Sequence, residues 1–153
     1  MIPKLTICTI SYNRPQELLE MLQSLIPQLP YADVVKEVII LNNGSTDDYS
    51  KVEAFINNHP ELQIRYMHSE INLGVAKGKT KVLKEAQTPY IMVLDDDAEF
   101  DQPGDFRKMI AIMEEPLFIG HNTAIVTIGI WYHATRERQI NAFPHKNYEV
   151  YKH

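Results

Sequence analysis

Hydrophobic and polar positions in the first hundred residues follow two patterns, one of strands and one of helices. Short apolar runs with strand character lie at residues 4–12, 37–41, 62–68 and 90–94. Between them, segments with a single apolar stripe and helix-starting residues predict helices at 15–26, 48–57 and 74–86. Regular strand–helix alternation with short turns is typical of βαβ units. We therefore predict a Rossmann-like, doubly wound, mostly parallel α/β sheet.

The pattern changes after the first hundred residues. Residues 104–115 have helical spacing and residues 123–131 form a long apolar strand, whereas residues 132–153 are polar, aromatic and unassigned. A chain of 153 residues with 44% hydrophobic composition can bury one core but has little room for a second. We predict a single domain over residues 1–153, with residues 1–100 as its βαβ core.

Composition and charge narrow the class of protein. The chain has 15 basic and 20 acidic residues, and its net charge of −5 argues against a nucleic acid as the main partner. Cys8 is the only cysteine and lies in an apolar strand, so a reducing compartment is expected. There is no signal-peptide pattern and no apolar run of about 18 residues. We expect a cytoplasmic, soluble protein without a transmembrane segment, which can still act at a membrane surface.

Three consecutive carboxylates, Asp95, Asp96 and Asp97, follow directly after the apolar run that begins at Tyr90. Adjacent anions repel one another unless solvent or a cation neutralises them. The run itself has the two-sided apolar character of a buried parallel strand. Since ligands of open α/β sheets bind at the carboxyl ends of strands, the triplet predicts a metal-using site there.

All four predicted strands end in polar or turn-forming residues. The exits comprise residues 11–14, 42–45, 68–74 and 95–97. The carboxyl ends of parallel strands meet at one edge of a sheet, so these segments are expected to line one cleft. Each exit alone is weak support, because Asn-Gly-Ser is common turn chemistry and a polar turn can simply begin a helix.

Four motifs occur in order along these exits: TICTISYNRP at 6–15, EVIILNNGSTDD at 37–48, NLGVA at 72–76 and LDDDA at 94–98. Together they resemble the motifs of family 2 glycosyltransferases of the GT-A fold, with the last as the Asp-x-Asp element. The resemblance implies a metal-dependent, inverting transferase that moves a sugar from a nucleotide-diphosphate donor. It also implies Mg²⁺ or Mn²⁺, a UDP-sugar as the favoured donor, and a glycan or lipid-linked acceptor.

The same resemblance assigns site residues. Those expected around the nucleotide sugar are Thr9, Ser11, Tyr12, Asn13, Arg14, Asn42, Gly44, Gly74, Lys79, Asp95 and Asp96. Within this set Asn42 would lie beneath the base and Asp95 would approach the ribose. Asp97, together with Asp95, would ligate the metal, which fits a hard dication that bridges one or two carboxylates to phosphates.

The chain departs from the family pattern in three respects. Asn42 stands where an aspartate is frequent, and an amide can still accept an imide N–H through its carbonyl. Lys79 replaces a frequent arginine, keeping the charge but losing the planar fork. Family members usually continue well past this length, so we expect residues 101–153 to be only the start of the acceptor-side region, truncated or incomplete. Glu137 and Glu149 lack the context of a catalytic base, which we expect to be absent.

Other readings stay open. The aspartates can form a solvated turn without a ligand. The chain can be a non-catalytic module that binds a nucleotide diphosphate. A phospho-acceptor receiver is less favoured because its acidic pocket normally lies on the first strand rather than the fourth. A nucleotidyltransferase would need a glycine-rich, basic loop after the first strand, which the sequence lacks.

Overall fold

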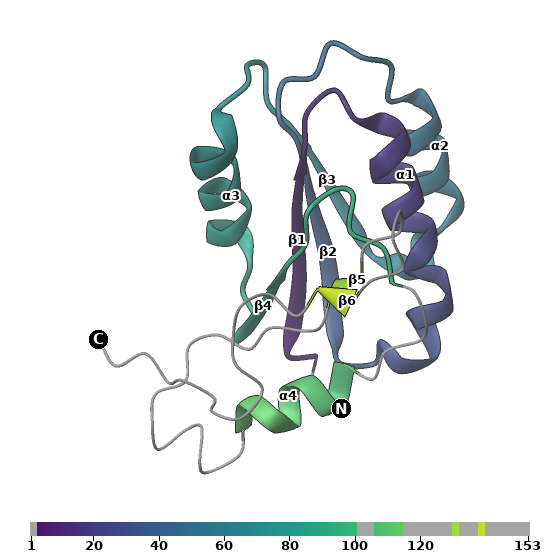
Figure 1. Ribbon diagram of the computed structural model, residues 1–153, viewed down its shortest axis with the longest axis vertical. Helices are drawn as coiled ribbons and strands as arrows, with labels where there is room; N and C mark the ends of the chain where they lie inside the picture. Colours follow the sequence, from purple (N-terminus) through teal and green to yellow (C-terminus); the bar gives the residue numbers. More distant parts are fainter. Residues whose placement is uncertain (1–2, 101–105, 115–129, 132–137, 140–153) are drawn as a thin grey trace. The chain divides into compact units, whose positions relative to one another are not determined.

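A four-stranded parallel sheet with helices on both faces forms the first part of the chain (Figure 1). The structure is a computed structural model that describes residues 3–100, 106–114, 130–131 and 138–139. The sheet has the order β3-β2-β1-β4 and every pair is parallel. Its strands are β1 Leu5–Ser11, β2 Val35–Asn42, β3 Ile64–His68 and β4 Tyr90–Val93. Its helices are α1 Pro15–Ser24, η1 Ile26–Tyr31, α2 Ser50–Asn58, η2 Pro60–Leu62 and α3 Gly74–Glu85.

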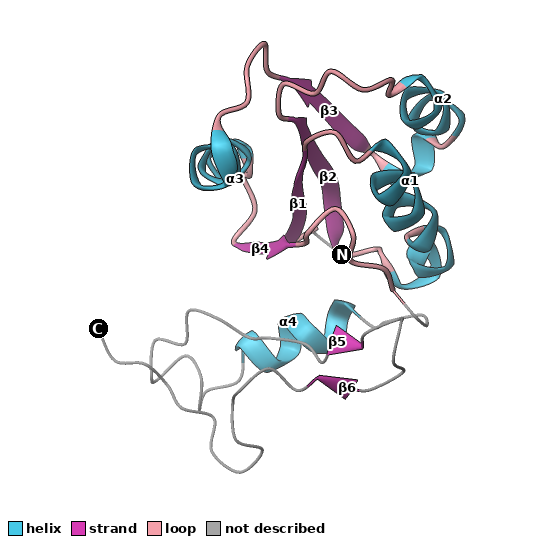
Figure 2. Cartoon of the chain, turned by 45° about the horizontal axis from the view of Figure 1, so that its top comes forward, coloured by secondary structure: helices cyan, strands magenta, loops and turns pink. Residues whose placement is uncertain are grey.

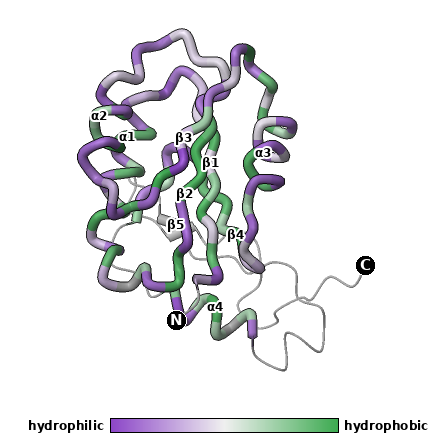
Figure 3. The backbone as a smooth tube through the Cα atoms, turned by 180° about the vertical axis from the view of Figure 1, so that it is seen from behind, coloured by the Kyte–Doolittle hydropathy of each residue, from purple (hydrophilic) through white to green (hydrophobic). Residues whose placement is uncertain are grey.

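The sheet separates two layers of helix. Figure 2 shows α3 on one side and α1 with α2 on the other. Under α3, a cluster of Cys8, Ile39, Leu41 and Val82 is wholly buried. The apolar stripe of α1 is buried too, and each of its leucines removed from water contributes roughly 1.5–3 kcal/mol. Figure 3 shows hydrophobic residues concentrated along β1, at the centre of the sheet.

β4 lies at an edge of the four-stranded sheet, which corrects one prediction. The apolar run 90–94 predicts a strand buried on both faces, yet Ile91 is 39% exposed and Val93 is 45% exposed. Among the described strands β4 pairs only with β1, and α3 packs on β1 and β2 instead. The strand is present as predicted, but Ile91 and Val93 are exposed, while Tyr90 and Met92 are partly buried.

Proline and a left-handed residue shift the predicted boundaries. The helix predicted to reach residue 26 ends at Ser24, and a 3₁₀ segment that contains Pro27 and Pro30 follows. Strand β3 begins two residues later than predicted, because Gln63 adopts a left-handed conformation with φ 50°. These shifts leave the strand order and the helix layers unchanged.

The chain divides into two compact units, residues 1–107 and 108–153. Helix α4, Phe106–Glu114, begins in the first unit and continues into the second. In the second unit β5 Ile130–Trp131 pairs with β6 Arg138–Gln139 in antiparallel orientation. Most of the predicted strand 123–131 and both Glu137 and Glu149 lie outside the described residues. The single domain over 1–153 stays a prediction. No described helix is long and apolar enough to span a membrane.

Candidate functional site

The exits of β1 and β2 are joined by hydrogen bonds between their loops. Asn13 lies just after β1 in a left-handed conformation, φ 53°, which asparagine tolerates better than most residues. Its side-chain oxygen accepts the backbone N–H of Thr46 at 2.8 Å, and its own N–H donates to Ser45 Oγ at 3.0 Å. Two loops that are 32 or more residues apart are therefore fixed to each other.

Asn42 ends β2 and is buried, with both ends of its amide occupied. Its Oδ1 accepts the backbone N–H of Ser45 at 3.0 Å, and its Nδ2 donates to the Tyr66 hydroxyl at 3.0 Å. Because the Ser45 N–H can only donate, it determines which end of the amide is oxygen. Burial raises the pKa of Tyr66, and the hydrogen bond from Asn42 opposes that rise.

Asn43 connects the end of β2 to the start of α3. Its Oδ1 accepts the N–H of Leu73 at 3.1 Å, while its Nδ2 donates to Asn72 Oδ1 at 3.1 Å. Asn72 Oδ1 also accepts the N–H of Gly74, the first residue of α3, at 2.7 Å. The buried amide of Asn43 thus holds the loop that opens the helix carrying Lys79.

Two glycines at this rim have positive φ, and they differ in their surroundings. Gly44 has φ 78°, and a Cβ there would lie 2.3 Å from the carbonyl carbon of Ile71. Gly74 has φ 75°, and a Cβ there would meet nothing within 4 Å. Close backbone approach therefore requires glycine at position 44, whereas Gly74 faces open space.

The aspartate triplet is divided by burial. The Asp96 side chain is 9% exposed, whereas those of Asp95 and Asp97 are 67% and 51% exposed. Lys79 Nζ lies 2.7 Å from Asp95 Oδ1. Arg14 contacts the other two, with Nη1 at 3.2 Å from Asp96 Oδ1 and Nη2 at 3.0 Å from Asp97 Oδ2. Each carboxylate therefore has a cationic partner, and two of them face solvent.

Two hydroxyl groups hold the backbone of Arg14, the residue that contacts the buried aspartate. The Tyr49 hydroxyl accepts the backbone N–H of Arg14 at 3.1 Å and lies 2.8 Å from Ser11 Oγ, and the Ser11 hydroxyl donates to the Arg14 carbonyl at 3.4 Å. Burial raises the pKa of Asp96, while the Ser11 hydrogen bond and the charge of Arg14 oppose that rise. The hydrogen bond to Asp97 raises the pKa of Arg14, so its guanidinium stays charged.

The structure therefore brings most of the predicted site residues to one rim, with two qualifications. Thr9 lies deeper in β1, is 1% exposed, and its hydroxyl has no hydrogen-bond partner in the described part of the chain. Tyr12, by contrast, is 42% exposed. Sequence reasoning missed Tyr49 and Tyr66, because neither lies in a motif and only the fold places their hydroxyls against Ser11 and Asn42.

The residues present fit one kind of metal site. Among the described residues no group of three or more histidine, cysteine, aspartate or glutamate side chains could hold a metal ion. Asp95 and Asp97 nonetheless offer exposed carboxylate oxygens whose present partners are solvent-accessible cations. Mg²⁺ and Mn²⁺ suit one or two carboxylates completed by phosphates and waters, so the pair fits such a site and does not fit an all-protein cage.

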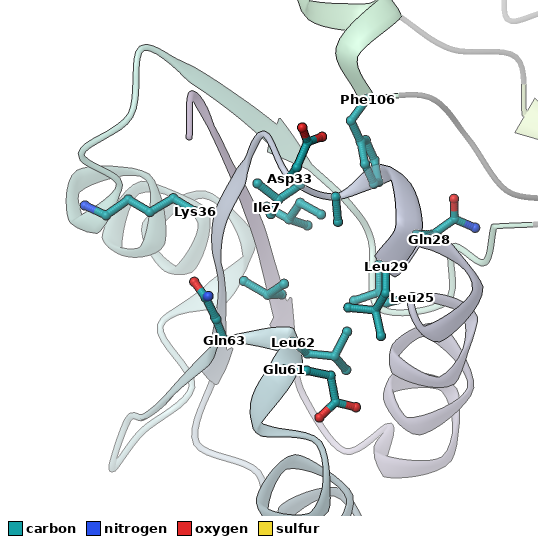
Figure 4. A pocket seen from close by; sticks show the side chains of 13 residues that line it. Ile7, Leu25, Gln28, Leu29, Asp33, Lys36, Glu61, Leu62, Gln63 and Phe106 are labelled. Carbon is teal, nitrogen blue, oxygen red and sulfur yellow. The ribbon is translucent and has the colours of Figure 1, made fainter. Parts of the chain in front are cut away.

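A separate cavity of about 200 Å³ lies at the other end of the sheet (Figure 4). Val35 and Gln63, near the amino ends of β2 and β3, line it together with Leu25, Leu62 and Phe106. The carboxylates of the triplet do not line this cavity. It belongs to the packing of η1 and η2 against the sheet and not to the rim described above.

The glycosyl transferase family 2 model matches residues 6–151. The chain belongs to glycosyl transferase family 2.

Two bacterial proteins are similar to this chain in sequence. The uncharacterized glycosyltransferase YwdF of Bacillus subtilis is 33% identical over 126 residues, covering 81% of this chain and 43% of YwdF. The poly-beta-1,6-N-acetyl-D-glucosamine synthase of Staphylococcus epidermidis is 33% identical over 104 residues, covering 63% of this chain and 24% of the synthase. The family 2 chain thus spans less than half the length of either.

Solved structures match its fold. The mannosyltransferase PcManGT from Pyrobaculum calidifontis, in complex with GDP-Man and Mn²⁺, superposes with a TM-score of 0.67 at 22% identity, over 76% of this chain and 34% of that one. TarS of S. aureus in complex with UDP gives 0.61 at 23% identity, over 72% of this chain and 32% of that one. These neighbours are GT-A glycosyltransferases, so the predicted α/β, GT-A type fold is confirmed.

Proposed function

We propose that this family 2 chain is the nucleotide-sugar-binding part of a metal-dependent, inverting glycosyltransferase. The observation that carries the proposal is the division of the triplet, in which Asp95 and Asp97 face solvent beside Lys79 and Arg14. This arrangement offers anionic oxygens to a dication and cationic groups to phosphates at the same rim. A nucleoside diphosphate with its metal carries both of these charges.

Asp97, with Asp95, would hold the Mg²⁺ or Mn²⁺ ion. When bound, such an ion neutralises the charge that develops on the departing nucleotide diphosphate. Lys79 and Arg14 would bind the phosphates, and Asp95 would also approach the ribose. Asp96 would keep the Arg14 guanidinium in position, and Ser11 would hold its backbone carbonyl. The attack by the acceptor hydroxyl on the anomeric carbon would need a base, and we assign that base to no described residue.

The nucleoside would lie between Tyr12 and Asn42. Tyr12 is 42% exposed, so its ring would be available for stacking, and in the described part of the chain the Asn42 carbonyl accepts one hydrogen bond, from Ser45. A carbonyl oxygen has two lone pairs, so Asn42 can also accept an imide N–H. Uracil has such a group, and a UDP-sugar is the donor that we favour. TarS in its complex holds UDP and PcManGT holds GDP-Man, so both bases belong in the test.

The relatives also suggest the class of acceptor. One of them is named as a synthase of a poly-N-acetylglucosamine, and another as a teichoic acid polymerase. We therefore propose a glycan or a lipid-linked glycan as the acceptor, with the enzyme working in the cytoplasm or at the cytoplasmic face of a membrane. No nucleic acid is expected as a partner, given the net charge of −5.

Calorimetric titration of the purified chain with UDP or GDP in the presence of Mn²⁺ tests the proposal. Asp97→Ala should weaken nucleotide binding at least about tenfold, because it removes a carboxylate from the metal. Asp33→Ala is a matched control, since Asp33 is 46% exposed and is paired with Arg107 at 3.1 Å, whereas Asp97 is 51% exposed and is paired with Arg14 at 3.0 Å. The control should bind as the wild type does.

Absence of nucleotide binding by the wild type, or equal affinities for Asp97→Ala and the control, would contradict the proposal. Release of sugar from a labelled donor then separates a transferase from a module that only binds. A chain that binds but never turns over, even with acceptor glycans present, would support the binding module.

A further inference from the structure

Arg14 lies between two carboxylates that differ in burial. One arm of its guanidinium, Nη1, is 3.2 Å from Asp96, whose side chain is 9% exposed. The other arm, Nη2, is 3.0 Å from Asp97, whose side chain is 51% exposed. Its Nε is 3.6 Å from Glu17, in the first turn of the helix α1 that follows Arg14. Asp96, the buried partner of the guanidinium, is therefore fixed in the protein, whereas the exposed Asp97 can turn toward solvent.

Hydrogen bonds hold the backbone of Arg14, and burial restricts its partner Asp96. The Arg14 N–H donates to the Tyr49 hydroxyl at 3.1 Å, and its carbonyl accepts the N–H of Leu18 at 3.1 Å. The Arg14 carbonyl also accepts the Ser11 hydroxyl at 3.4 Å. The Arg14 side chain is still 42% exposed. Arg14 is thus held at its backbone by Tyr49 and at Nη1 by Asp96, while Nη2 contacts the exposed Asp97.

We propose that Arg14 is a counter-ion that alternates between Asp97 and the substrate. It stays bound to Asp96 throughout, neutralises Asp97 in the free protein, and offers the same arm to a phosphate oxygen once a divalent cation has taken Asp97. This inference rests on the proposed function, because it assigns Arg14 to the diphosphate of that ligand. A guanidinium can do this because its planar fork binds two separate oxyanions at once.

The two roles of Arg14 have opposite consequences for binding. Without nucleotide, the guanidinium competes with the cation for Asp97, so it weakens metal binding. With nucleotide, it adds a charge-assisted hydrogen bond to the diphosphate, so it strengthens nucleotide binding. Removing it should therefore move the two affinities in opposite directions. A residue that only supports the fold would not produce that result.

The experiment compares the full-length wild type with Arg14→Gln, Arg14→Lys and Arg107→Gln. Arg107 is a matched control, with a side chain that is 45% exposed and 3.1 Å from the carboxylate of Asp33. Electron paramagnetic resonance of free Mn²⁺ measures metal binding without nucleotide. Calorimetry measures UDP binding at saturating Mn²⁺, and thermal unfolding shows that each variant is folded.

Arg14→Gln should bind Mn²⁺ about two- to fivefold more tightly, the size of an exposed ion pair. It should bind UDP about tenfold or more weakly, the size of a lost charge-assisted hydrogen bond. Arg14→Lys keeps the charge but loses the fork, so its Mn²⁺ affinity should stay near that of the wild type while UDP binding weakens. Arg107→Gln should change each affinity by less than about twofold, because screening isolates remote charges.

The outcomes separate this inference from the proposed function. If the wild type binds UDP with Mn²⁺ but Arg14→Gln changes both affinities in the same direction, or neither, the inference is overturned and the proposed function stands. If the wild type binds neither UDP nor GDP with Mn²⁺, both fall. Should Arg14→Gln fail to fold, Arg14→Lys decides, because weakening of both affinities by this variant would overturn the inference.

Discussion

The carboxyl ends of β1 and β2 are surrounded by buried polar side chains, whereas the amino ends of β2 and β3 border a largely apolar cavity. At the carboxyl rim Asn42, Asn43 and Asp96 are buried and each is hydrogen-bonded. At the amino end apolar side chains such as Leu25, Leu62 and Phe106 form most of the cavity lining, which Gln28, Asp33, Lys36, Glu61 and Gln63 complete. Burying polar groups costs free energy unless each has a partner, while apolar contacts need no such pairing.

The difference indicates what each end of the sheet contributes. The polar rim joins the loops that follow the strands by hydrogen bonds, and it presents charges at defined positions. The apolar end contributes chiefly to the free energy of unfolding, because apolar burial is the main favourable term in folding. Substitutions of the charged side chains at the rim should therefore change ligand binding, whereas substitutions of the tightly packed rim glycine or of the amino end should change stability. The following variants test that distinction.

Gly44→Ala should have the largest effect. A Cβ at this position would lie 2.3 Å from the Ile71 carbonyl carbon, and φ is 78°. We expect a loss of more than about 4 kcal/mol in the free energy of unfolding, or no folding at all, since both overlap and backbone strain act together. Gly74→Ala is the control, because φ is 75° but a Cβ meets nothing within 4 Å, and it should cost only about 1–2 kcal/mol. Urea unfolding measures both. Similar losses for the two variants would contradict the packing described for Gly44.

Leu25→Ala tests the amino end. Leu25 is 3% exposed and lines the cavity, so its truncation should lower the free energy of unfolding by roughly 2–4 kcal/mol. Its affinity for UDP with Mn²⁺, measured where the variant is fully folded, should stay within about twofold of the wild type. A large loss of affinity at unchanged fold would show that the two ends of the sheet are coupled.

Cys8 tests whether the buried cluster in the middle of the sheet excludes water. Burial raises the pKa of Cys8 from 9.0 to about 11, so the unfolded chain loses the thiol proton at a lower pH than the folded chain does. Between these two values the unfolded state binds fewer protons. Stability should therefore fall as pH rises from 9 to 11, by roughly 2–3 kcal/mol from this group.

The measurement is the free energy of unfolding of wild type and Cys8→Ala across that range. The difference between the two should shrink or reverse with rising pH, because alanine has no proton to lose. A difference that stays constant up to pH 11 would show that the thiol is not desolvated.

The sequence predicts the sheet well because strand and helix patterns depend on local periodicity and burial. The four strands, three crossover helices and the meeting of strand exits follow from that periodicity and from the rules for parallel sheets. The exposed faces of Ile91 and Val93 could not be predicted, because apolar composition does not say which strand lies at an edge. Periodicity also does not reveal which aspartate of the triplet turns inward.

The residues that support the rim could not be predicted from local sequence either. Tyr49 precedes α2 and Tyr66 lies in β3, and nothing in their local sequence indicates a partner. Their hydroxyls reach Ser11 and Asn42 only because three strands lie side by side. Contacts between residues 24 or 38 positions apart are set by topology and not by local pattern. The charged residues of the motifs could be listed in advance, but not the pairing among them.

The most direct test of the central claim is the location of manganese in a crystal soaked with MnCl₂ and UDP, by anomalous diffraction. We predict a manganese peak about 2–2.5 Å from a carboxylate oxygen of Asp97, with Arg14 still on Asp96 and its other arm on a phosphate oxygen. Manganese and UDP bound elsewhere, with Arg14 and Asp97 still paired as at 3.0 Å here, would contradict it.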